Sequence, residues 1–171
     1  MSFLSRLLGT EPDPREQLRP LWHRAVSLAR TPDYYSECQV ADNVAGRFDM
    51  ITAVSACVMV RLEASDMRSE SALFAELFVE DMEGQMREFG VNDVVVGKRM
   101  GKVMSSLGGR LGAYRPALNN RDHDALTQAI ERNVTFEEGG SPECVAGKML
   151  GLMEQLSEET DEQLLAAKAI A

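Results

Sequence analysis

The side chains best suited to chemistry in this chain are cations gathered in one short stretch. Between Val94 and Arg121 the sequence has six Lys or Arg residues and no Asp or Glu, although the whole chain has 27 acidic and 18 basic residues. Clustered charge of one sign attracts partners of the opposite sign, so the stretch predicts a docking surface more than a catalytic pocket. The net charge of −9 argues against DNA binding, since phosphate contacts dominate that affinity. The six cations are Lys98, Arg99, Lys102, Arg110, Arg115 and Arg121.

These cations share a predicted helix over residues 96–118 with a row of small residues. At 100° per residue, an apolar stripe that includes Met104 lies on one side of this helix. Four glycines cost about 1 kcal/mol each relative to alanine, so their presence needs a reason. Small side chains let a second helix approach closely, and that helix belongs either to this chain or to a bound partner. Both interpretations stay open for the row, which is Gly101, Ser105, Gly108 and Gly112, with Gly109 beside it.

One carboxylate, Asp81, falls inside the apolar arc of a predicted helix over 71–89. A buried carboxylate must be paired or hydrogen-bonded, and Arg47 and Lys98 are the candidate partners. The alternative is that Asp81 marks the rim of an open groove. A single carboxylate does not define a reaction, and two isolated histidines are too few for a metal site or a nucleophile relay. We therefore expect surface histidines, no enzyme activity, no metal and no cofactor.

The elements that carry these residues are predicted to be helices throughout. No stretch shows the alternation of a strand, so the sequence predicts an all-α, single-domain bundle of about six to seven helices. We expect a tip and linker over 1–14, a core over 15–136 and a helical extension over 137–171. Pro20 is tolerated only in a first turn, so the first helix becomes regular near Arg19. The predicted helices are 15–30, 48–64, 71–89 (capped by Ser69 and ended by Gly90), 96–118, 124–135, 142–156 and 162–170.

The cysteines and the hydropathy pattern predict the compartment in which the protein is located. Three cysteines without a CxxC pair predict reduced thiols in a cytosol-like compartment, with Cys57 as a core residue. The uncharged run Met50–Val60 is shorter than the roughly 20 residues that span a bilayer, so it predicts a buried helix. The first nine residues lack the pattern of a signal peptide. We expect a cytoplasmic protein, with peripheral contact to the inner membrane as a further expectation.

Five motifs in order resemble the ubiquinol–cytochrome c chaperone family, from Leu21 to Phe136. Singly they are weak, but their order and spacing are specific. They are Gly46-Arg47-Phe48-Asp49-Met50; Leu77-Phe78-x-x-Asp81-Met82; Met86-Arg87-Glu88-Phe89-Gly90-Val91-x-Asp93-x-x-Val96-Gly97-Lys98-Arg99; Gly109-Arg110-Leu111-x-Ala113-Tyr114; and Ala129-x-x-Arg132-Asn133.

The resemblance implies an all-helical assembly factor for ubiquinol–cytochrome c reductase, with cytochrome b as the suspected client and a small helper protein as a further partner. A second hypothesis is an electrostatic adaptor that binds the ribosome or an anionic membrane surface through the basic helix. With the charge pattern, the motifs predict a set of partner-binding residues: Arg47, Phe48, Asp81, Arg87, Gly90, Asp93, Gly97, Lys98, Arg99, Lys102, Gly108, Arg110 and Gly112.

Overall fold

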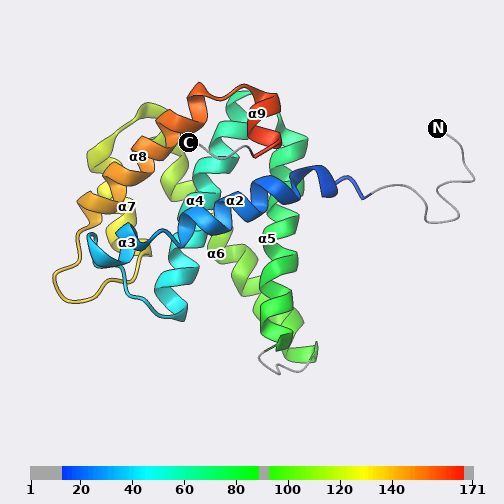
Figure 1. Ribbon diagram of the computed structural model, residues 1–171. Coiled ribbons are helices and arrows are strands. Elements are labelled where there is room, and N and C mark those ends of the chain that lie inside the picture. The colour runs from blue at the N-terminus through cyan, green and yellow to red at the C-terminus, as the bar shows by residue number, and fades with distance from the viewer. Residues whose placement is uncertain (1–12, 89–92, 168–171) are drawn as a thin grey trace, which may run out of the picture.

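The protein folds as helices packed around one central helix, in a computed structural model that describes residues 13–88 and 93–167 (Figure 1). Between the described residues, extended backbone pairs only at an isolated antiparallel bridge, Val40 with Phe136. The all-α prediction is confirmed. The elements are η1 (Glu16–Leu18), α2 (Arg19–Ala29), α3 (Pro32–Ser36), α4 (Val44–Ala64), α5 (Arg68–Glu88), α6 (Asp93–Asn120), α7 (His123–Asn133), α8 (Pro142–Glu158) and α9 (Asp161–Leu165).

Helix α4 forms the centre of the core. Every residue from Asp49 to Leu62 is buried, because α2, α5, α6 and α8 pack against it from different sides. The prediction of a buried helix at Met50–Val60 is confirmed. No helix in the described ranges is long and apolar enough to cross a membrane.

Several predicted helix ends differ from the observed ones for local reasons. The side chain of Asn43 accepts hydrogen bonds from the backbone N–H groups of Ala45 and Gly46, so α4 begins four residues before the expected start. Helix α5 begins at Arg68, which places Ser69 inside the helix and makes its assignment as a cap wrong. Helix α2 becomes regular at Arg19, as expected from Pro20.

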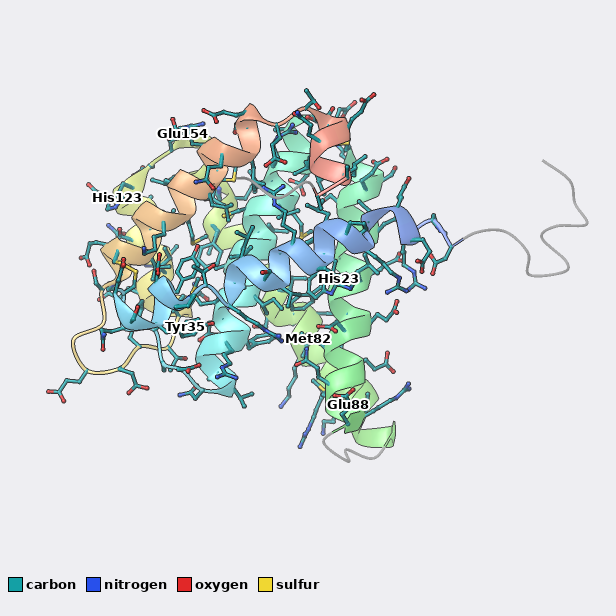
Figure 2. All side chains as sticks on the ribbon, in the orientation of Figure 1. His23, Tyr35, Met82, Glu88, His123 and Glu154 are labelled. Carbon is teal, nitrogen blue, oxygen red and sulfur yellow. A yellow bond between two sulfur atoms is a disulfide. The ribbon has the colours of Figure 1, made fainter. Side chains whose placement is uncertain are left out.

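Helices α5 and α6 run antiparallel and extend below the rest of the molecule (Figure 1). Glu88, at the end of α5, marks the tip of this extension in Figure 2. The amino-terminal half of α6, which carries Lys98 and Lys102, belongs to the same projecting arm. The first part of the predicted basic stretch, with Lys98 and Lys102, therefore lies where a large partner has ready access.

Cys38 and Cys144 form a disulfide with their Cα atoms 5.3 Å apart, so the prediction of reduced thiols is wrong for this pair. Their separation of 106 residues gave no sequence signal, since the connectivity of cysteines cannot be read from spacing. Backbone hydrogen bonds accompany the disulfide, including Ser141 N–H to the Cys38 carbonyl at 3.0 Å. Cys57 is free and buried as expected, and burial raises the pKa of its thiol to about 12.

Arg61, near the end of α4, joins the centre of the fold to its carboxyl-terminal helices. Its side chain is 9% exposed. The guanidinium donates to the carbonyl of Leu156 at 2.8 Å and to that of Glu159 at 2.7 Å, and it pairs with Asp161 at 3.0 Å. A cation at these carbonyls complements the negative end of α8.

Candidate docking surface

Helix α6 presents one buried side and one open side. The predicted apolar stripe faces the core, with the exception of Met104, which is 46% exposed. That residue was expected in the stripe but lies at its edge, beside a surface hollow between α5 and α6. The buried members of the stripe are Val96, Met100, Leu107, Leu111, Tyr114 and Leu118.

The small residues of α6 form an open face that we call the glycine face: Gly101, Ser105, Gly108, Gly109 and Gly112. All five are exposed. A Cβ atom added at any of the four glycines would meet no heavy atom within 4 Å outside the helix backbone itself. Close packing against another helix of this chain is therefore excluded over the described residues. Of the two interpretations that the sequence left open, the one with a helix of this chain is wrong for the described residues, and the one with a partner stays a prediction.

A hollow of about 780 Å³ adjoins the glycine face between α5 and α6. Its lining is mixed: Ala72, Ala75 and Val79 of α5 and the exposed Met104 of α6 form the apolar part. The charged part is Arg15, Glu76, Glu80 and Glu83. Met104 lies next to Gly108 on the helix wheel, just outside the glycine face, so the hollow adjoins that face. Together they form a shallow surface on which apolar side chains lie beside accessible helix backbone.

Three of the predicted cations lie free beside this face. Lys98, Arg99 and Lys102 are exposed, and none of them forms an ion pair with any residue that the structure describes. Such cations retain their full hydration and their full attraction for an anionic partner. Arg115 differs, because it pairs with Glu63 of α4 at 2.9 Å.

Arg110 points inward and is held by the fold. Its guanidinium pairs with Asp49 of α4, a carboxylate that is 3% exposed, and lies 5.1 Å from the centre of the Phe48 ring. Asp49 also accepts hydrogen bonds from the backbone N–H of Thr135 at 2.9 Å and from its hydroxyl at 2.7 Å. The motif Gly46-Arg47-Phe48-Asp49 thus supplies a link among α4, α6 and residue 135. Sequence reasoning missed this role of Asp49, although the motif already contained the residue.

The other motif residues lie apart from the glycine face. Arg47 pairs with Asp42 at 2.7 Å, so the expected pair between Arg47 and Asp81 is wrong. Asp81 is half-buried and accepts a hydrogen bond from Gln85 at 2.9 Å, and it forms no ion pair with Lys98.

A close backbone contact explains why the motif has a glycine at position 46. A Cβ atom there would lie 2.0 Å from the Ala41 carbonyl oxygen, so only glycine lets the chain before α4 pass so closely.

Only part of the turn before α6 lies within the described residues. Gly90 lies outside the described residues, and Asp93 is the first residue of α6. Gly97 lies inside that helix with open space around it and without a positive φ, so no unusual backbone conformation requires a glycine there. Arg87, on α5, pairs with Glu83 at 2.8 Å. His23 and His123 are exposed, as expected (Figure 2).

Comparisons with known proteins agree with the motifs. A family model described as ubiquinol–cytochrome C chaperone matches residues 36–171. The crystal structure of the Cbp3 homolog from Brucella abortus is similar, with a TM-score of 0.75 and 29% sequence identity over 89% of this chain and 86% of that one. No curated protein matches the sequence. The match extends through α8 and α9, which lie beyond the motifs noted above. This chain therefore belongs to the ubiquinol–cytochrome c chaperone family.

Proposed function

We propose that this protein is a non-enzymatic assembly chaperone that binds cytochrome b, a helical membrane protein, during the biogenesis of ubiquinol–cytochrome c reductase. Family membership supports the chaperone role. The observation that carries the binding mode is the open glycine face of α6. Four exposed glycines cost about 4 kcal/mol of helix propensity in total, and a partner helix that packs closely on them offsets this cost.

The client helix lies along the glycine face and fills the hollow beside Met104 in this proposal. Methionine side chains adapt to varied apolar partners, which suits a client that is still folding. Lys98 and Lys102 flank the face and attract acidic residues or lipid phosphates next to the client helix. We leave Arg110 out of this surface, because its guanidinium is held by Asp49.

A matched pair of substitutions tests the proposal. Gly108→Leu places a large side chain on the glycine face, whereas Gly147→Leu does the same at an exposed, open glycine of α8. In a deletion strain, Gly108→Leu should lower cytochrome b and quinol oxidation, while Gly147→Leu restores both. Circular dichroism should show both variants folded. Equal activity of the two variants would reject the glycine face as the client site.

A photo-crosslinker at Lys98 or Lys102 tests the identity of the client. We expect capture of cytochrome b during its synthesis. Capture of other proteins without cytochrome b would exclude this client, whatever the outcome at Gly108.

A second candidate function is an electrostatic adaptor, which the three unpaired cations favour. Each basic residue near an anionic membrane adds about 1 kcal/mol of binding. Co-sedimentation with anionic liposomes and with ribosomes should weaken as salt rises, and Lys98→Glu with Lys102→Glu should abolish it. Arg121→Glu with Arg132→Glu is the control, because it changes the net charge equally at exposed cations outside the arm. Binding that ignores salt would contradict this function.

We propose that the protein acts beside the inner membrane, on its cytoplasmic side. The Cys38–Cys144 disulfide removes the support that reduced thiols gave to a cytosol-like location, so the placement depends on the family and its client.

A further inference from the structure

A second apolar hollow, separate from the glycine face, lies where α2, α4, α5 and α6 meet. Its volume is about 310 Å³, at the lower end of the range for pockets that hold small molecules. Residues from four helices line this hollow, which we call the pit. Its apolar lining includes Phe48, Ile51, Met82, Met86 and Val103, and Val44 at its edge is 79% exposed.

Two guanidinium groups stand where this pit opens. Arg30, just after α2, and Arg47, on α4, line the apolar pit and also a polar hollow of about 670 Å³ beside it. Tyr35 and Asp42 contribute to the polar hollow. Figure 2 labels Tyr35 on the polar side and Met82 on the apolar side, with the amino-terminal end of α4 between them. The apolar pit and the polar hollow thus meet at Arg30 and Arg47.

The charge at the junction favours an anion. Arg30 is exposed and its side chain has no partner among the described residues, whereas Arg47 pairs with Asp42. Two cations and one carboxylate leave one positive charge in excess. The Arg47 and Asp42 side chains are 62% and 60% exposed, and exposed pairs of this kind contribute little. An incoming anion can therefore replace Asp42 as the partner of Arg47 at low cost.

We propose that these joined hollows bind a single-chain anionic lipid. Its hydrocarbon chain occupies the pit against Met82 and Met86, and its anionic head lies between Arg30 and Arg47. A guanidinium donates two parallel hydrogen bonds to a carboxylate or phosphate, which gives the head group both strength and orientation. The site shares no residue with the glycine face, so it stands apart from client binding.

Calorimetric titration of the purified full chain tests the site, with dodecanoate as the probe below its micelle concentration. Dodecyl maltoside has the same chain with a neutral head, and dodecyltrimethylammonium has it with a cationic head. We expect dodecanoate to bind in preference to both. Equal binding of all three probes would overturn the proposal, since it would show adsorption of the chain alone.

Three substitutions locate the binding site. Met86→Trp fills the pit, and Arg30→Glu reverses the free charge; each should weaken dodecanoate about tenfold or more. Asp42→Asn frees Arg47 and should tighten binding. Because Arg30 and Asp42 are exposed, these two variants remain informative even where Met86→Trp disturbs folding.

The matched controls are Met104→Trp, at an exposed methionine outside the pit, and Arg132→Glu, at an exposed cation of α7. Both should bind dodecanoate as the unmodified protein does. Loss of binding in the controls to the same extent as in Met86→Trp and Arg30→Glu, or tight binding in all variants, would refute the assignment.

Discussion

The buried link between Asp49 and Arg110 should be a sensitive polar contact in the fold. Arg110→Met retains the length and apolar contacts of the side chain on Phe48 and removes only its charge and donors. Asp49, which is 3% exposed, then loses its cation but keeps both hydrogen bonds from Thr135. Burying a carboxylate without its cation is unfavourable, so the folded state loses free energy relative to the unfolded one.

The size of the effect follows from these contacts. Breaking one partner of a buried ion pair destabilises a protein by about 3–5 kcal/mol. The two remaining hydrogen bonds of Asp49, and the 15% exposure of the Arg110 side chain, place the expected loss near the lower end, at about 3 kcal/mol. For a chain of this size, that loss corresponds to a fall in Tm of roughly 6–12 °C.

Urea and thermal unfolding, followed by circular dichroism, measure the effect. Arg47→Met is the control, because its pair with Asp42 is exposed; its unfolding midpoint should not move measurably. Asp49→Asn combined with Arg110→Met should be less damaging than the sum of the single changes, since the two residues act as a pair. A loss below about 1 kcal/mol for Arg110→Met would mean that the link contributes no more than a surface pair does.

Three further predictions concern other parts of the molecule. Cys144→Ser opens a loop of about 100 residues and should lower the free energy of unfolding by about 2–5 kcal/mol, and a reductant should do the same to the unmodified protein but not to the variant. Gly108→Ala should raise the free energy of unfolding by about 1 kcal/mol in chemical denaturation, because open space surrounds this position; a decrease would mean that the face is covered. The Ser65 hydroxyl and then the Arg61 guanidinium hold the pKa of Asp161 below its ordinary value of 3.8, so its stabilising effect is present above pH 3.8 and is lost as the pH falls through the lower value of the folded state. Protection of α9 from hydrogen exchange should therefore fall on acidification, and in Asp161→Asn it should already be reduced and largely insensitive to pH over this range.

Helix content was predictable from the sequence, whereas helix ends depended on side chains whose role is local. Asn43 begins α4 because its carboxamide caps the first turn, and nothing in the apolar pattern marks that residue. The short helix α3 was missed, since five residues are too few to show a period. The disulfide was missed because its two cysteines meet only through the tertiary fold.

The faces of α6 that make up the candidate docking surface were predictable only in part. A helix wheel separates the faces of α6 but does not show which face another helix covers. The helix wheel correctly placed Gly108 on one outer face and Lys98 on another. It wrongly grouped Arg110 with the exposed cations. The buried partner of Arg110, Asp49, lies 61 residues earlier in the chain, and only the packing of α6 on α4 brings them together.

Arg61 has a consequence for the order in which the core closes. The carbonyl acceptors of its guanidinium, at Leu156 and Glu159, lie 95 and 98 residues later in the chain. Until α8 docks, burial of α4 leaves a cation in the core without these acceptors, which is unfavourable. The final packing of the central helix is therefore coupled to the docking of α8, and the two should form together in one cooperative step.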